Sequence, residues 1–439
     1  MNSWDRGAAL KSGNHHVKRL FKASAFATIA AVGVGAVASA QDFDDFSRNR
    51  NTGVRDRVRP DFDAVGVDMA PFVLLPRIDF TTEVDDNILA TETNTRTDVI
   101  LRMRPGATLK SQWVRHELNL SAYADINRYG ANHSENTIDY GAKLNGRLDA
   151  HHWTQLVGSV SYDHLTESRA QQNSTTNTVS PVEYGLMNAD VAGIQQFSFF
   201  KFTLGGHYSN YEYQNGVDAG GTTVFEKDRN LTVWEETGRV EYALTPDQAV
   251  YVSGTLSQHF YDLVPPAVTL NRNSTGFTVL SGFSFDLTNL VTGDIGVGYF
   301  DQSYDHLSGQ NAGGFTLNGD VKWFPTQLTT VSLNVSRRMQ DAAVGVSAGY
   351  ISTGGTLQVD HELRRWLILT ATASYNFDAY QGIDRNDKRW GGGVSATYLM
   401  NRYMGLSFGY AHSTQHSTGV NRFVNYDDNK WTVSLVFQK

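Results

Sequence analysis

The side chains best suited to chemistry in this 439-residue sequence are charges at alternate positions in runs of small or apolar residues. Alternate residues of an extended strand project from one face, so each set would line one side of a strand. Because unpaired charges are costly in a dry interior, we expect this face to be wet or densely ion-paired. The charges could form a transverse field that selects permeating solutes, or they could only neutralise one another. The candidate pore-lining residues are Arg102, Arg104, Asp125, Asp139, Lys143, Arg147, Lys201, Glu235, Arg239, Glu241, Asp320, Lys322 and Asp378.

One cluster of residues is a candidate for binding a metal ion. Asp85, Asp86 and Asn87 offer oxygen ligands that could hold a divalent cation or bridge cations of lipopolysaccharide. The same residue types more often form the turn that begins a loop. Histidines such as His116 and His207 have no spacing of two histidines and a carboxylate, so the sequence predicts no metal site and no cofactor.

Catalysis lacks a sequence signature. Serine, histidine and acidic residues are plentiful, but a catalytic triad is defined by geometry, which the order of residues does not reveal. The chain has no nucleophile motif such as G-x-S-x-G between a strand and a helix. We therefore expect no enzyme and no catalytic residue.

The composition narrows the class of protein. The chain has 45 acidic and 37 basic side chains, a net charge of −8, and no cysteine. An acidic chain is a poor partner for nucleic acid. Without cysteine there is neither a disulfide framework nor a thiolate metal site. The 40 glycines, 20 tyrosines and 23 phenylalanines, with only 9 prolines, favour β-structure.

The first 40 residues have the pattern of a secretory signal peptide. Basic residues precede an apolar stretch at 23–37, and Ala38-Ser39-Ala40 follows, so we expect cleavage before Gln41 and export by the general secretory route. Residues 41–76 are polar and lack periodicity, which predicts a mobile periplasmic tail that could dock on a partner. Beyond the signal peptide no stretch approaches the roughly 18 apolar residues of a membrane-spanning helix.

Residues 77–439 show the period of two that is typical of strands. In the last run, Trp431, Val433 and Leu435 alternate with Thr432 and Ser434. Eight short turn-like links alternate with nine longer polar links. This pattern predicts an all-β protein, a single up-and-down antiparallel transmembrane β-barrel of about 18 strands, with 16 as the alternative. Both termini would lie on the short-link side, which is periplasmic in such barrels.

Aromatic residues are expected at the two lipid–water interfaces. The tryptophans predicted near the short-link side or its strand ends are Trp113, Trp153, Trp323, Trp366 and Trp431. Pro105 falls inside the second predicted strand, where it removes a hydrogen-bond donor and predicts a bulge or bend.

Three segments resemble the opening strands of an outer-membrane β-barrel porin family found in alphaproteobacteria. They are VGVDMAPFVLLP at 65–76, VDDNILAT at 84–91 and WVRHELNLSA at 113–122, and the resemblance covers about residues 65–165. Family members are commonly linked to exopolysaccharide production and export. The resemblance therefore implies an outer-membrane exit for a secreted polysaccharide, and it implies no catalytic residue.

The expected function is a passive channel in the outer membrane of a Gram-negative cell. Its partners would be outer-membrane lipid, lipopolysaccharide and the barrel assembly machinery. If the resemblance holds, a periplasmic polysaccharide co-polymerase or export protein would join them. Two alternatives stay open from the sequence: a general diffusion porin for small solutes, and a structural or adhesion barrel with no open pore. The sequence leaves the permeant and the oligomeric state undefined.

Overall fold

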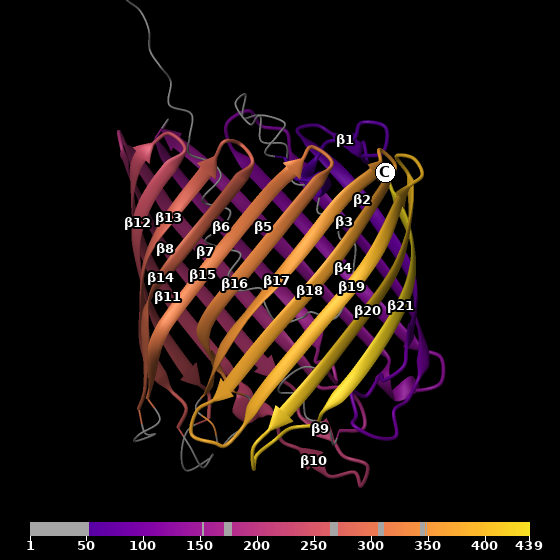
Figure 1. Cartoon of the computed structure of the whole chain (residues 1–439). Coiled ribbons are helices and arrows are strands. Elements are labelled where there is room, and N and C mark those ends of the chain that lie inside the picture. Colours follow the sequence, from indigo (N-terminus) through magenta and orange to yellow (C-terminus); the bar gives the residue numbers. More distant parts are fainter. Residues whose placement is uncertain are drawn as a thin grey trace, which may run out of the picture.

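The computed structural model describes residues 52–151, 153–170, 178–263, 271–305, 311–342, 347 and 349–439. The predicted signal peptide and the first part of the predicted tail lie outside these residues. Within them, 18 antiparallel strands form one closed barrel, as predicted (Figure 1). No helix in the described part of the chain is long and apolar enough to cross a membrane.

Each wall strand pairs with its neighbours in sequence, and β2 pairs with β21 to close the barrel. Closure leaves no open edge, so backbone N–H and C=O groups find partners within the wall. The wall strands are β2 (Phe72–Asp85), β3 (Asp98–Ser111), β4 (Glu117–Tyr129), β5 (Thr137–His151), β6 (Thr154–Thr166), β7 (Glu183–Phe197), β8 (Phe200–Tyr213), β11 (Leu231–Thr245), β12 (Gln248–Tyr261), β13 (Ser274–Leu287), β14 (Val291–Tyr304), β15 (Ala312–Thr326), β16 (Thr329–Asp341), β17 (Gly349–Arg364), β18 (Leu367–Tyr380), β19 (Asn386–Leu399), β20 (Met404–Thr418) and β21 (Tyr426–Gln438).

The connections alternate in length as the sequence predicted. Short turns join β7 to β8 and β11 to β12, whereas residues 86–97 and 214–230 form long loops. We call the two ends of the barrel the turn end and the loop end. The loop between β8 and β11 carries the small hairpin of β9 (Gly216–Val217) and β10 (Thr223–Val224), which lies at the loop end (Figure 1). The described residues also contain three short 3₁₀ helices: η2 (Val54–Asp56), η3 (His133–Glu135) and η4 (Lys227–Arg229).

The wall begins earlier than the sequence predicted. Strand β2 starts at Phe72, and residues 72–76 pair with residues 107–111 of β3, so this part of the predicted tail belongs to the barrel. Strand β1 (Val67–Met69) pairs with the start of β2. The apolar run at 72–76 is long enough to extend the strand pair toward the turn end.

Pro105 produces no register shift, so of the predicted bulge or bend the bulge is wrong. The pairing with β2 continues through Pro105, and the pairs Met103–Ile126 and Gly106–Tyr123 with β4 keep one register on both sides of it. The missing N–H interrupts the ladder to β4 without displacing the strand. Register shifts occur instead near turns, as between Glu362 and Arg364.

Four of the five predicted tryptophans lie at the turn end, in or next to the turns: Trp113, Trp153, Trp323 and Trp366. The prediction that Trp431 lies near the turn end is wrong. This residue pairs with Val84 near the loop end of β2, and its ring lies 5.5 Å from that of Tyr410. Because β21 runs from its loop-end start at Tyr426 toward the turn end, Trp431 belongs to the loop-end half of the wall. That these aromatics lie at lipid–water interfaces stays a prediction.

Candidate functional site

The candidate site is the inner face of the barrel. On β11 the side chains of Arg239 and Glu241 are buried, whereas Val240 and Tyr242 between and beside them are exposed on the outside. The same alternation places all thirteen predicted pore-lining residues at inward positions of their strands. That these side chains line a conducting pore stays a prediction.

A network near the turn end brings three of the predicted residues together. Lys201 Nζ lies 2.9 Å from Glu241 Oε1, and Arg239 Nε lies 3.1 Å from the same oxygen. Arg239 also pairs with Asp294 at 2.9 Å, and the Tyr251 hydroxyl donates to Asp294 at 2.7 Å. The sequence analysis missed Asp294 and Tyr251, although both hold inward positions of their strands. These charges neutralise one another across β8, β11 and β14.

Three more predicted residues have oppositely charged partners in the wall. The pairs are Arg102 with Glu83 at 2.8 Å, Arg147 with Glu117 at 3.5 Å and with Asp149 at 3.3 Å, and Asp378 with Arg389 at 2.7 Å. Lys322 has its carboxylate partner outside the wall, because Asp56 of η2 lies 3.7 Å away.

Other inward carboxylates have no cation partner in the described ranges. Asp125 and Asp139 face each other across the β4–β5 pair, and neither forms an ion pair with a described residue. Asp163, which the sequence analysis missed, accepts a hydrogen bond from the Tyr123 hydroxyl at 3.0 Å. Arg104 lies over the Tyr123 ring at 4.9 Å. The remaining predicted residues without an ion pair among the described residues are Lys143, Glu235 and Asp320.

Tyrosines gather at the loop end of the inner face. Tyr184 stacks on Tyr213, and Tyr350 stacks on Tyr380, each pair with ring centroids 5.0 Å apart. Arginines cover three tyrosine rings: Arg229 lies over Tyr213 at 4.1 Å, Arg272 over Tyr261 at 4.2 Å and Arg385 over Tyr380 at 4.2 Å. These tyrosines point inward and are shielded by the loops, so they do not belong to the lipid-facing belt.

The loops at this end are joined by buried ion pairs. Arg169, in the loop after β6, pairs with Glu135 of η3 at 3.0 Å. Arg229 of η4 pairs with Glu226 at 2.9 Å and also with Glu167 of the loop after β6. Next to them, burial raises the pKa of the Asp228 carboxyl above its usual value. The three loops therefore form one connected layer.

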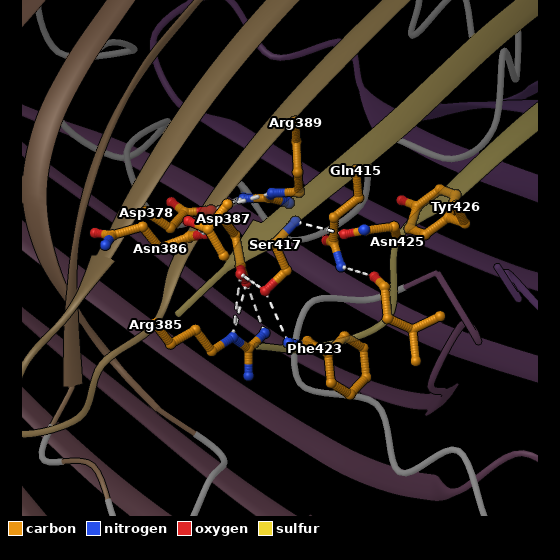
Figure 2. A network of polar contacts seen from close by, with 12 residues as sticks. Asp378, Arg385, Asn386, Asp387, Arg389, Gln415, Ser417, Phe423, Asn425 and Tyr426 are labelled. Carbon is orange, nitrogen blue, oxygen red and sulfur yellow. Dashed lines mark hydrogen bonds and ion pairs between the residues drawn. The ribbon is translucent and has the colours of Figure 1, made fainter. Parts of the chain in front are cut away.

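A second network joins β18, β19 and β20 to the final loop (Figure 2). Arg385 lies 2.6 Å from the buried Asp387, and the Ser417 hydroxyl donates to Asp387 at 2.5 Å. The Phe423 N–H donates to Ser417 Oγ at 2.7 Å, which ties the loop between β20 and β21 to the wall. Figure 2 shows Asp378 next to this network, paired with Arg389.

Part of the predicted tail docks inside the barrel. We call residues 53–62 the N-terminal strap. Arg55 lies 2.7 Å from Asp360 and Arg59 lies 2.9 Å from Glu362, two inward carboxylates of β17. These residues lack apolar periodicity, which predicts a mobile tail, but charge and hydrogen bonds hold them against the wall. The signal in the sequence is the alternation of three arginines, Arg55, Arg57 and Arg59, with other residues.

In the acidic cluster at the start of the first long loop, the Lys430 ammonium group pairs with the carboxylates. The carboxylates of Asp85, Asp86 and Asp428 lie within 4.8 Å of one another. Lys430 Nζ lies 2.9 Å from Asp85 and 3.1 Å from Asp428. The Asn87 N–H donates to Asp85 Oδ1 at 2.8 Å, which is the turn geometry that the sequence favoured.

One Ser, Asp and His group occurs on the inner face. His207 Nδ1 lies 2.6 Å from Asp190, and the Ser159 hydroxyl donates to the other oxygen of Asp190 at 2.9 Å. In a catalytic relay the serine contacts the histidine, which then accepts its proton. Here serine and histidine both contact the carboxylate, so this group does not have relay geometry.

Comparison with known proteins agrees with this architecture. Residues 59–439 match the sequence model of the family described as "Putative beta-barrel porin 2", and the chain belongs to that family. It is thus a porin-like β-barrel channel of the outer membrane. A search of curated proteins gives no match.

Solved outer-membrane proteins of Pseudomonas aeruginosa are similar at low identity. For OpdK the identity is 10%, with 83% of this chain and 99% of that chain covered and a TM-score of 0.43. For OccK2 (OpdF) the identity is 9%, the coverage 83% and 98%, and the TM-score 0.44. For a mutant of the ferric enterobactin receptor PfeA the identity is 8%, the coverage 86% and 81%, and the TM-score 0.44.

Proposed function

We propose that this barrel is a passive diffusion channel for small polar solutes, with a preference for cations. The observation that carries the proposal is the imbalance of uncompensated charge on the inner face. Among the predicted pore-lining residues, four acids (Asp125, Asp139, Glu235 and Asp320) have no ion-pair partner in the described ranges, against two bases (Arg104 and Lys143). Rings and patches of carboxylates favour permeating cations.

Two features favour small solutes over a bulky polymer. At the loop end, the Tyr426 hydroxyl donates to the carbonyl of Ala170, a residue of the loop after β6, at 3.4 Å. His259 of β12 lies 2.7 Å from Asp341 at the end of β16. These contacts join segments that are several strands apart around the barrel. Together with the strap at the turn end, these contacts leave a smaller cross-section for solute than the strand wall alone would leave.

Planar bilayers and liposome swelling test this proposal. We expect discrete current steps, a reversal potential in a KCl gradient that reports cation preference, and faster swelling with monosaccharides than with larger oligosaccharides. Anion preference would contradict the charge argument. The absence of current and swelling would contradict a channel and favour a structural or adhesion barrel, which should alter surface attachment instead.

Exopolysaccharide export is a second candidate, and the sequence resemblance over residues 65–165 favours it. In that role the polar and aromatic inner face would exchange weak hydrogen bonds and stacking contacts with a hydrated sugar chain. Deletion of the gene should then stop polysaccharide secretion and leave polymer in the periplasm. Neighbouring genes for glycosyltransferases and a polysaccharide co-polymerase would support it. Unchanged secretion would contradict it.

A further inference from the structure

The N-terminal strap follows the inner wall at the turn end. The Val54 N–H donates to the hydroxyl of Thr330 on β16 at 2.9 Å. Further along, Arg402 in the turn before β20 donates to the Pro60 carbonyl at 2.7 Å, and Gln438 at the end of β21 donates to the Phe62 carbonyl at 3.1 Å. The strap therefore runs along the inner wall from β16 to β21 at the turn-end mouth.

Three arginines of the strap form ion pairs with the wall. Arg57 and Arg59 lie 3.0 Å and 2.9 Å from the same Glu362 carboxylate, and Glu362 has no other cation partner among the described residues. Asp360 pairs with Arg55 in the same way. Both carboxylates are buried, although they stand on the inner face of the wall. Among the described residues, Asp360 and Glu362 of the wall therefore form ion pairs only with arginines of the strap.

The strap lacks the bonds that hold a permanent part of the wall. Apart from η2, residues 52–66 contain no helix or strand, so no ladder of backbone hydrogen bonds joins them to the barrel. Val54 is the buried apolar residue of the strap, with 0% of its surface exposed. The Arg55 and Arg57 side chains are 32% and 27% exposed, so salt can reach and weaken their ion pairs, although less than it weakens fully exposed pairs. A backbone ladder has no such salt dependence.

We infer that the N-terminal strap is a releasable constriction of the channel, latched by Arg55, Arg57 and Arg59 to Asp360 and Glu362. The latched strap narrows the turn-end mouth, and release widens it. This inference rests on the proposed channel function. The competing view is a brace that only stabilises the wall, and a brace would affect unfolding but not conductance.

The first test removes the latch charges. The triple variant Arg55→Gln/Arg57→Gln/Arg59→Gln should conduct severalfold more than the wild type at low salt. The matched control removes three exposed arginines outside the strap, as Arg128→Gln/Arg365→Gln/Arg422→Gln, and should conduct like the wild type. A lower unfolding midpoint with unchanged conductance would establish the brace and overturn the latch.

The second test locks the strap in a folded barrel. The chain has no cysteine, so Gly53→Cys/Thr330→Cys introduces its only two thiols. A Cβ at residue 53 lies 3.7 Å from Thr330 Cγ2, close enough for a disulfide after small adjustment. The screening length falls from about 10 Å at 0.1 M salt to about 3 Å at 1 M. The ratio of the conductance of the reduced protein to that of the oxidised protein should therefore rise with salt, because the fixed charges of the inner face act on both forms alike.

Thiol labelling separates failure of the latch from failure of the channel. Cysteine at position 54 should react slowly with a maleimide in the otherwise wild-type protein and rapidly when the three strap arginines are also replaced. Rapid labelling without current in any variant would overturn the channel function and leave strap release standing. Equal current in all variants, with no dependence on the disulfide, would overturn the latch and leave the channel standing.

Discussion

Replacement of Arg229 by methionine should destabilise the loop-end layer strongly. The Arg229 side chain is only 6% exposed, and its partners Glu167 and Glu226 are 0% and 5% exposed. Methionine keeps much of the contact with the Tyr213 ring but removes the guanidinium that pairs with both buried carboxylates. Loss of one partner of a buried ion pair costs about 3–5 kcal/mol, so we expect a decrease of that size in the free energy of unfolding.

Urea unfolding of the purified barrel in lipid or detergent measures this change, read from the midpoint at constant slope. The control is Arg422→Met, because Arg422 and Glu92 are 51% and 46% exposed and such surface pairs contribute about 0–1 kcal/mol. Adding Glu167→Gln and Glu226→Gln to Arg229→Met should recover most of the loss, since the cost comes from uncompensated charge. Equal effects of Arg229→Met and Arg422→Met would refute this reasoning.

Three further predictions concern charge and backbone. Burial raises the pKa of Asp228 in the folded protein, so its contribution to stability is present below its unfolded pKa and lost as pH rises through the folded value. Asp228→Asn should therefore raise the unfolding midpoint at pH 7 and leave it unchanged at pH 3; a lower midpoint at pH 7 would show that the ionised carboxylate is stabilising. Asp125→Asn/Asp139→Asn should shift the reversal potential in a KCl gradient toward zero, and an unshifted potential would mean that these carboxylates do not face the permeating ions. Pro105→Val restores an N–H that can donate toward β4, and it should raise the free energy of unfolding by about 0.5–1.5 kcal/mol in a urea titration. A loss of stability would indicate that the proline ring fills a space that valine does not.

The ion pairs of the loop-end layer and of the strap could not be predicted from the sequence. Arg59 and Glu362 are separated by 303 positions, and Arg239 and Asp294 by 55. Neither pair has a local signature, because its members meet only after neighbouring strands align and the barrel closes. The position of Trp431 was missed for a related reason: its depth depends on the pairing of β21 with β2.

The sequence by itself determined the class of fold, a strand count of about 18 with 16 as the alternative, and the face to which the predicted pore-lining side chains point. These properties follow from local physics, since a period of two assigns alternate residues to opposite faces and the lengths of the links distinguish turns from loops. Only the tertiary structure decided which inward charges neutralise one another, that Lys430 occupies the acidic cluster, and that three arginines of the tail reach Asp360 and Glu362. Those outcomes depend on strand register and closure, which set distances between residues far apart in the chain.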